Sequence, residues 1–200
     1  LEFVPEPKVN AGASQMQIAA KDSVQRLSKN QIYGPYLDGN SYVLAKMLDT
    51  KVLPDSVKCR HVLVSTDVQN GGYADSVASK KIDSIKNAIS GGAVWGDMVE
   101  KYNPVSDGSR QNKGEMTFSS TDIQGENFAK EFGQFILFDG KPGERKVVKT
   151  SFGYHYIEIM SFIKPENHYK VAYLFQEISP SKETISTAQG NAAKFASESK

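Results

Sequence analysis

The residues of this chain that could carry out chemistry are few, because its 200 residues include only one cysteine and three histidines. Cys59 and His61 stand two positions apart in residues 57–64, where alternating side chains predict a β-strand. Residues two apart on a strand share a face, but they are poorly placed for the thiol–imidazole contact that makes a cysteine a nucleophile. We therefore interpret Cys59 as a packing residue of the strand.

A metal site is not predicted from the histidines. His155 belongs to a second candidate strand, residues 154–162, and neither it nor His61 has a third Cys, Asp or Glu at ligand spacing. A single thiol also cannot form an intrachain disulfide or a structural zinc site alone. The sequence thus predicts no metal and no cofactor, and the third histidine, His168, is expected in an exposed loop.

The charge balance disfavours nucleic acid as a partner. Lys plus Arg number 24 and Asp plus Glu number 23, with no long block of one sign, whereas a protein that follows phosphates normally carries a basic stripe. The hydrophobic content of 39% is typical of a folded domain, and no apolar run reaches the roughly 18 residues of a membrane-spanning helix. Because the chain begins at Leu1 rather than Met and ends at Lys200 in what is expected to be an unfinished helix, we interpret it as a piece of a longer protein. The lack of a signal peptide therefore carries little weight.

The elements that must position these side chains follow from hydrophobic periodicity and turn residues. Residues 1–12 are expected as a linker, 13–29 as a helix, and 42–48 as a strand or one helical turn. Beyond the strand at 57–65, the pattern predicts the following elements: a helix from Asp75 to Gly91, a helix at 95–102, a strand at 115–119, a helix at 127–137, strands at 146–150, 154–162 and 169–178, and a helix from Lys182. This mixed order predicts an α+β domain with a largely antiparallel sheet.

Four motifs within residues 57–162 together resemble the parvulin-type peptidyl-prolyl cis/trans isomerases. They are VKCRHVLV at 57–64, KGEMTF at 113–118, GKPG at 140–143 and SFGYHYIEI at 151–159. The resemblance implies a parvulin-like (FKBP-like) fold, in which helices wrap a four-stranded antiparallel sheet. It implies that His61 and His155 lie on neighbouring central strands, hydrogen-bonded to each other beneath the active site.

The same resemblance implies a pocket for the proline ring and a polar residue beside it. The pocket residues would be Phe118, Ile123 and Phe128 or Phe132, although helical spacing makes core packing an equal alternative for the last two. Active members often carry Cys or Asp in the loop after the second helix. Here Asp107 or Ser106 could fill that position, the spacing does not decide between them, and a loop-capping role for Asp107 is the alternative.

The chemistry implied requires no cofactor. Amide resonance sets a barrier of about 18–20 kcal/mol to rotation of a prolyl bond, and an apolar pocket that excludes water favours the less polar twisted state. The loop at 65–73 contains Asp67 and no Lys or Arg, so no phosphate requirement is predicted. We expect an isomerase acting on X–Pro bonds of unfolded or exported polypeptides, or alternatively a catalytically weak peptide-binding chaperone domain.

The domain organisation and location are also implied by the resemblance. The isomerase domain is expected at 55–163, and the flanks at 1–54 and 164–200 are expected to belong to a neighbouring chaperone-like region. Multi-domain members with this layout are exported to the periplasm or cell envelope and are often membrane-anchored. Their partners are unfolded or extended proline-containing polypeptides.

Overall fold

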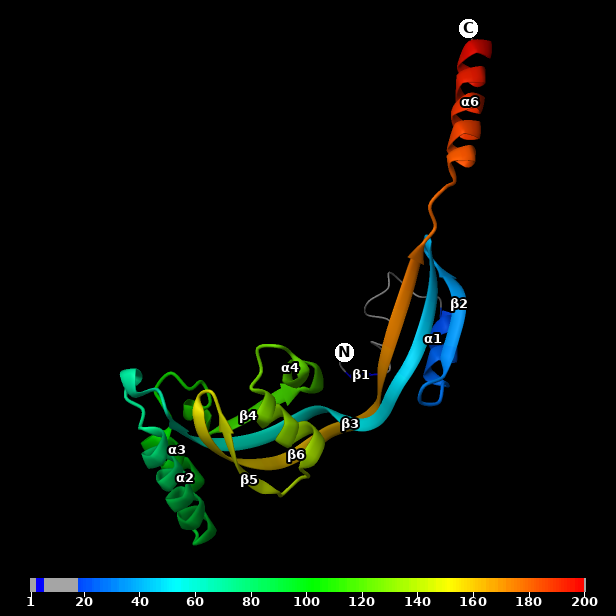
Figure 1. Ribbon diagram of the computed structural model, residues 1–200. Helices are drawn as coiled ribbons and strands as arrows, with labels where there is room; N and C mark the ends of the chain where they lie inside the picture. The colour runs from blue at the N-terminus through cyan, green and yellow to red at the C-terminus, as the bar shows by residue number, and fades with distance from the viewer. Residues whose placement is uncertain (1–2, 6–17, 200) are drawn as a thin grey trace. The chain divides into compact units, whose positions relative to one another are not determined.

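The chain divides into two units, and the computed structural model describes residues 3–5 and 18–199 (Figure 1). The large unit comprises residues 1–6 and 50–170, and the small unit comprises residues 7–49 and 171–200. Residues 1–2 and 6–12 of the expected linker and 13–17 of the expected first helix lie outside the described residues.

The large unit is built on an antiparallel sheet in which four strands follow the order β4–β3–β6–β5. Their bounds are Glu115–Ser119 for β4, Ser41–Ser65 for β3, Gly153–Glu177 for β6 and Arg145–Thr150 for β5. A short strand, β1 (Val4–Pro5), pairs with β6. The predicted four-stranded antiparallel sheet is confirmed, but the strands expected at 57–65 and 154–162 are parts of longer strands.

Alternation along the two central strands separates two hydrophobic cores, one on each face of the sheet. Val62 and Val64 of β3 and Tyr156 of β6 pack against α2 (Asp75–Ser90) and α3 (Trp95–Tyr102). Because side chains alternate along a strand, His61 and His155 point to the opposite face. The sheet therefore holds both imidazoles on one side, away from α2 and α3.

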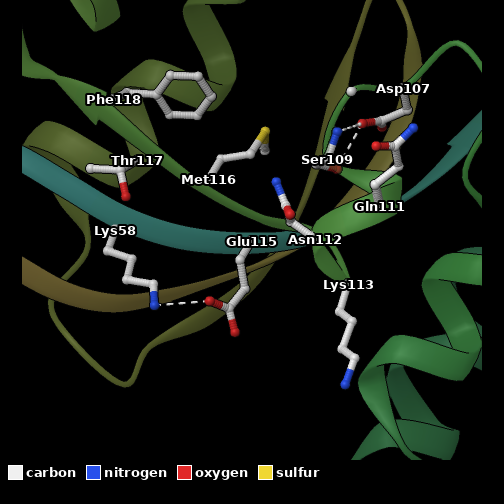
Figure 2. A pocket seen from close by; sticks show the side chains of 11 residues that line it. Lys58, Asp107, Ser109, Gln111, Asn112, Lys113, Glu115, Met116, Thr117 and Phe118 are labelled. Carbon is white, nitrogen blue, oxygen red and sulfur yellow. Dashed lines mark hydrogen bonds and ion pairs between the residues drawn. The ribbon is translucent and has the colours of Figure 1, made fainter.

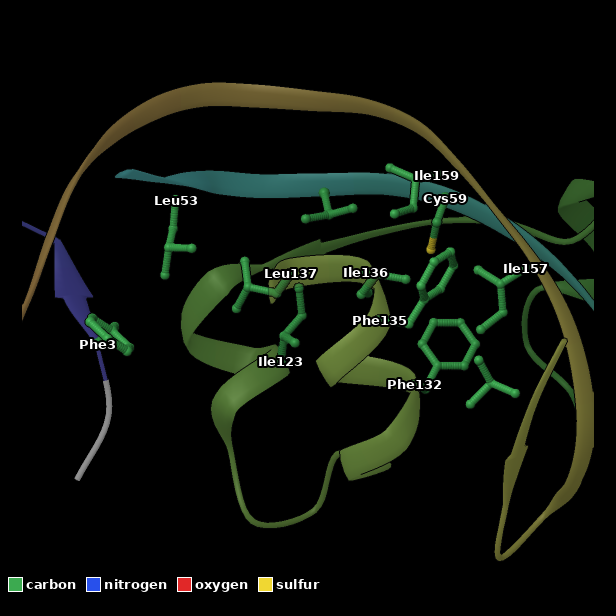
Figure 3. Close-up of a cluster of buried hydrophobic side chains, with 12 residues drawn as sticks. Phe3, Leu53, Cys59, Ile123, Phe132, Phe135, Ile136, Leu137, Ile157 and Ile159 are labelled. Atoms are coloured by element: carbon green, nitrogen blue, oxygen red, sulfur yellow. The ribbon is translucent and has the colours of Figure 1, made fainter. Parts of the chain in front are cut away.

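The opposite face is covered by the segment between β4 and β5. It contains α4 (Ser120–Gln124), α5 (Lys130–Gly133) and η4 (Gln134–Asp139). Figure 3 shows their apolar side chains meeting those of the two central strands. The principal members of this core are Val57, Cys59, Ile123, Phe132, Phe135, Ile136, Ile157 and Ile159.

The helices before β4 are those the sequence predicted. In α2, Ala78, Ile82, Ile85 and Ile89 are buried at spacings of four, three and four, which places them on one helical face. The helix ends at Gly91, whose N–H bonds the carbonyl oxygens of the last turn. Both predicted helices, α2 and α3, are confirmed.

The prediction of a single helix at 127–137 is wrong. The segment forms α5 and then a π-helical turn, η4, in which Phe135, Ile136 and Leu137 are all buried. Three consecutive apolar residues exceed the narrow stripe that an ordinary α-helix buries, and a wider π turn accommodates them.

The prediction that His168 lies in an exposed loop is also wrong. Since β6 continues past Phe162, His168 lies in a strand and is fully buried.

The small unit contains β2, the first part of β3, the last part of β6 and two helices. β2 (Ile32–Asp38) pairs antiparallel with the first part of β3, so residues 42–48 form a strand. Val24 of α1 (Ile18–Gln25) is buried, as are Val43, Ala45 and Met47 of β3. The predicted C-terminal helix is present as α6 (Lys182–Glu198), which begins at the N-cap Ser181. None of the helices in residues 18–199 combines the length and apolar character needed to cross a membrane.

Candidate functional site

The loop between α3 and β4 carries Asp107 onto the histidine face of the sheet. Asp107 Oδ1 accepts hydrogen bonds from the Ser109 N–H (2.8 Å) and the Ser109 hydroxyl (2.7 Å), which closes an Asx turn. Its other oxygen accepts from Asn103 Nδ2 (3.1 Å) and lies 3.1 Å from His61 Nε2. Asn103 in turn accepts from the Leu63 N–H of β3 (2.9 Å), so the loop is tied to the strand that holds His61.

The two imidazoles meet below this carboxylate. His61 Nδ1 and His155 Nδ1 are 3.0 Å apart, and both rings are buried. The far nitrogen of His155, Nε2, lies 2.8 Å from Thr150 Oγ1, which accepts a hydrogen bond from the Phe152 N–H at 3.1 Å. The contact between the histidines that the resemblance implied is therefore present, and each ring has a second polar partner.

These partners assign the direction of the hydrogen bonds. The Ser109 hydroxyl lies 2.9 Å from His61 Nε2 and donates its own hydrogen to Asp107, and a carboxylate only accepts, so His61 Nε2 carries the hydrogen that faces Ser109 Oγ and Asp107. In a neutral His61, Nδ1 is then an acceptor, and His155 Nδ1–H is its donor. His155 Nε2 must accept, and the Thr150 hydroxyl supplies that hydrogen. One row of hydrogen bonds thus runs from Phe152 through Thr150, His155 and His61 to Ser109 and Asp107.

Burial and hydrogen bonding set the charges of this row. Burial, and to a lesser extent the neighbouring His61, lower the pKa of His155 to about 3, so His155 is neutral at pH 7. For Asp107 burial acts to raise the pKa. The hydrogen bonds from His61 and Ser109 outweigh it and hold the pKa of this carboxyl well below its usual range. The row therefore ends in a fixed negative charge.

An aromatic cluster lies against the imidazole pair. The Phe132 ring meets His61 and His155 edge-on, at centroid distances of 5.7 and 5.3 Å. Phe128 meets Phe132 at 5.9 Å and Phe118 at 4.9 Å, again in edge-to-face geometry. Phe132 is buried, as is Ile123, whereas Phe118 and Phe128 are half-buried. The reachable part of the cluster is therefore Phe118 and Phe128.

An open groove of about 740 Å³ runs from Asp107 along β4 and the short helix η3 (Arg110–Asn112). In Figure 2 the half-buried Met116 lies between Phe118 at one end and Asp107 at the other. The side-chain amides of Gln111 and Asn112 line the same groove. The groove thus combines the apolar Met116 and Phe118 with amide groups, two carboxylates and the side chains of Lys58 and Lys113, which is a surface suited to a short stretch of polypeptide.

A family model described as a PPIC-type PPIase domain matches residues 42–161. The chain belongs to this family. Chaperone SurA of Aliivibrio fischeri is 28% identical over 144 residues, which cover 70% of this chain and 31% of SurA. Foldase protein PrsA of Staphylococcus aureus is 29% identical over 116 residues, which cover 56% of this chain and 35% of PrsA. The chain thus spans about a third of the length of these curated relatives.

Solved structures are similar to the PPIC-type domain at lower identity. The isomerase PrsA from Bacillus anthracis aligns with a TM-score of 0.42 and 20% identity, covering 56% of this chain and 44% of that chain. The peptidyl-prolyl isomerase ESS1 from Candida albicans aligns with a TM-score of 0.42 and 15% identity, covering 54% of this chain and 63% of that chain.

Within the PPIC-type domain, the structure separates the two loop candidates of the sequence. Asp107 contacts His61, whereas Ser106 is exposed and lies in the lining of a second cavity. In the described part of the chain, no group of three or more His, Cys, Asp or Glu side chains is arranged to hold a metal ion.

Sequence reasoning missed four polar or apolar contributors to the site. They are Asn103, Ser109, Met116 and Thr150. The Asp-Gly-Ser run at 107–109 is a typical Asx-turn pattern and could have indicated Ser109. The partner of Thr150 depends on the position of a hairpin relative to His155, for which the sequence carries no local signal.

Proposed function

We propose that this PPIC-type domain catalyses cis/trans isomerisation of X–Pro bonds in unfolded polypeptides, without a phosphate requirement. The observation that carries the proposal is the ionised Asp107, fixed beside a buried imidazole pair at the end of a groove whose apolar surface is Met116 and Phe118. Family membership supports the same reaction class.

In this proposal the aromatic cluster binds the proline ring. Phe118 and Phe128 contact the ring, Phe132 forms the floor, and Ile123 supports that floor from within the core. Removing the prolyl bond from water disfavours the planar amide, because resonance makes it more polar than the twisted form. Preferential binding of the twisted form lowers the rotation barrier.

Asp107 acts on the acyl oxygen of the residue before proline. In the planar amide that oxygen bears resonance charge, which diminishes as the bond twists. A carboxylate beside it therefore raises the energy of the planar form more than that of the twisted form. His61 and His155 are positioning residues, since they hold Asp107 through the row of hydrogen bonds. The exposed Ser106 contacts the peptide at the edge of the site.

A peptide-binding chaperone domain with little catalysis is the second candidate. One observation favours it: Asp107 is ionised and surrounded by donors, so it has no proton to offer to the prolyl nitrogen. For both candidates we propose unfolded or extended polypeptides as partners, because the relatives are named as a chaperone and a foldase.

The test compares two phenylalanine variants in an assay of Ala-Xaa-Pro-Phe peptides, with cis/trans exchange measured by NMR. Phe118→Ala removes groove surface worth roughly 1–3 kcal/mol, so the catalysed rate is expected to fall about 5- to 150-fold. Phe138→Ala is the matched control, since Phe138 is also half-buried against the same core but lies outside the groove. Binding without any rate effect would favour the chaperone function, and neither binding nor acceleration would overturn both.

The location of the protein is a separate proposal. From the resemblance to exported foldases we propose that the full-length protein works in the cell envelope. Fractionation of the native host, followed by immunodetection, checks this expectation. Recovery of the protein in the cytoplasmic fraction alone would contradict it.

A further inference from the structure

A separate cavity of about 470 Å³ lies within the large unit and shares no lining residue with the groove at Asp107. Phe3 lines this cavity. Figure 3 shows Phe3 at the other end of the hydrophobic core from Phe132, the residue that meets the two imidazoles. The cavity is therefore distinct from the proposed catalytic site, and the proposed mechanism gives it no role.

Three lysines from three different elements line this cavity, which we call the lysine cavity. Lys51 comes from β3, Lys130 from α5 and Lys170 from β6. Among the described residues of the lining, the only carboxylate belongs to Glu126, which is exposed in the loop before α5. The wall thus carries an excess of positive charge, although the chain as a whole is nearly neutral.

Aromatic rings hold two of these ammonium groups in place. Lys51 Nζ lies 5.3 Å from the ring centroids of both Phe3 and Phe138, and Lys170 Nζ lies 5.5 Å from the centroid of Phe3. A cation–π contact orients an ammonium group but does not neutralise its charge. Phe3 is fixed in turn, because its N–H and its carbonyl oxygen both bond the side chain of Gln124. The two charges therefore lie around one immobile ring.

The charges of the lysine cavity have no anionic partner in the described part of the chain. The carboxylates described there form ion pairs with other cations, and none lies within 4.0 Å of Lys51, Lys130 or Lys170. Each ammonium group offers three N–H donors, and like charges gathered around one cavity repel one another. A carboxylate that enters the cavity accepts from these donors and relieves the repulsion.

We propose that the lysine cavity binds an acidic segment of a client polypeptide, through carboxylates that pair with Lys51 and Lys170. In an extended chain the side chains at positions i and i+2 point to the same side, roughly 6.5–7 Å apart. Because both ammonium groups lie around one phenyl ring, two carboxylates spaced in this way can reach both of them. The choice of a polypeptide as the partner rests on the proposed function, but binding here requires no catalysis.

A client held in the lysine cavity stays close to the proline-binding groove, because α5 contributes to the wall between the two. Gly133 lines the cavity, and a Cβ added to it would lie 2.9 Å from Ile123 Cγ2 and 3.2 Å from Phe128 Cδ1. Phe128 in turn meets Phe118, which lines the groove. One client that carries an acidic segment near a proline can therefore contact both sites.

The experiment titrates the nitrogen-15-labelled full chain with acetyl-Gly-Glu-Ala-Glu-Gly-amide and with its Gln and Lys counterparts, followed by NMR. These probes contain no proline. Each exposed charge pair changes affinity by up to about 5-fold, so the Glu peptide is expected to bind about 10-fold more tightly than the Gln peptide. Substituting both Lys51→Gln and Lys170→Gln should reduce this ratio to about 2, whereas Glu126→Gln should increase it.

Two further variants control for net charge and for the fold. Lys80→Gln together with Lys86→Gln removes the same charge from exposed positions on α2, outside the lining, and should leave the Glu preference unchanged. Lys51→Arg together with Lys170→Arg keeps both charges and should retain the preference.

The position of the bound peptide is read from side-chain amide resonances. Those of Gln124, which bonds Phe3 in the cavity wall, should shift during the titration with the Glu peptide, and those of Gln111 in the groove should not.

The outcomes separate this inference from the proposed function. A Glu preference that depends on Lys51 and Lys170, in a chain that does not accelerate prolyl exchange, would support the inference and overturn the isomerase. Acceleration of prolyl exchange with equal binding of the Glu, Gln and Lys peptides would do the reverse. A Glu preference that survives the double Gln substitution would also overturn the inference, as would binding of inorganic phosphate, titrated alone, in a chain that binds none of the peptides.

Discussion

His155 is a base that the folded chain keeps uncharged, and this has a consequence for acid stability. Burial lowers its pKa from the ordinary 6.5 to about 3, so the unfolded chain takes up a proton first as the pH falls. His155 therefore contributes stability that is complete above pH 6.5 and is lost between pH 6.5 and 3. The free energy of unfolding should fall by up to about 1.4 kcal/mol per pH unit in this window. Urea denaturation at a series of pH values measures this dependence of the free energy of unfolding on pH.

The carboxylate at the other end of the row, Asp107, affects the free energy of unfolding at lower pH than His155 does. The pKa of Asp107 is lowered from its ordinary 3.8, so its contribution is present above that pH and is lost as the pH falls below it. His155→Gln is the control for the histidine, because glutamine offers a donor and an acceptor but does not titrate. This variant should show a shallower slope between pH 6.5 and 4. An identical slope in both proteins would contradict the assignment.

At the scale of single residues, the sequence was sufficient to predict some members of the site but not the others. His61 and His155 were identified because each lies in a strand motif with a fixed position for the histidine. Asp107 and Ser106 were equivalent in the sequence, because only the Asx turn closed by Ser109 decides which side chain faces His61. Thr150 was missed because its hydrogen bond joins a hairpin to a ring that the sequence cannot orient.

At the scale of elements, Glu158 joins three strands of the sheet. From β6 it bonds Arg60 Nε of β3 and both Arg145 Nε (2.8 Å) and Arg145 Nη2 (2.7 Å) of β5. Its side chain is only 12% exposed, and the Arg60 guanidinium lies over Trp95 at 4.4 Å. Glu158→Gln leaves two cations with a neutral partner and should cost about 1–3 kcal/mol of the free energy of unfolding.

The matched control for this prediction is another glutamate of the same sheet. Glu115 on β4 pairs with Lys58 at 2.8 Å, and both side chains are roughly 40% exposed. Glu115→Gln should therefore cost less than about 1 kcal/mol. Guanidinium denaturation of the two variants gives both values. Equal losses would show that Glu158 does not tie the strands together.

Element types were predictable where one periodicity governed a segment. The four buried apolar residues of α2 and the alternation at 57–65 gave correct elements. The segment after β4 mixes helical spacing with three adjacent apolar residues, Phe135, Ile136 and Leu137. Its π turn depends on tertiary packing, because all three side chains are buried in the same core. The register of β3 with β4 likewise depends on contacts between segments that no local pattern contains.

For the molecule as a whole, Phe3 connects the start of the chain to the core of the large unit. Its N–H donates to Gln124 Oε1 (2.7 Å), and its carbonyl oxygen accepts from Gln124 Nε2 (2.8 Å). The Phe3 ring is 8% exposed and packs near Phe138 in the core that contains Cys59. Phe3→Ala should lower the free energy of unfolding by about 3 kcal/mol.

Cys59 provides the measurement for this prediction. The thiol is buried, and burial raises its pKa to about 12, so a thiol reagent reacts only when the core opens. If opening is fast relative to labelling, the labelling rate in Phe3→Ala should rise about 100-fold, as a loss of about 3 kcal/mol implies. Phe195→Ala on α6, where the ring is 74% exposed, should leave the rate unchanged. Equal labelling of both variants would contradict a core role for Phe3.

Because the two imidazoles share one Nδ1–Nδ1 contact, neither ring can change its proton arrangement alone. If the hydrogen of His61 moves to Nδ1, that nitrogen becomes a donor, so His155 Nδ1 must become an acceptor and the Thr150 hydroxyl must turn away. The tautomer of each ring therefore fixes the tautomer of the other. In a nitrogen-15 spectrum of labelled histidine, resonances of both rings should shift together, so one ring serves as a spectroscopic reporter of events at the other.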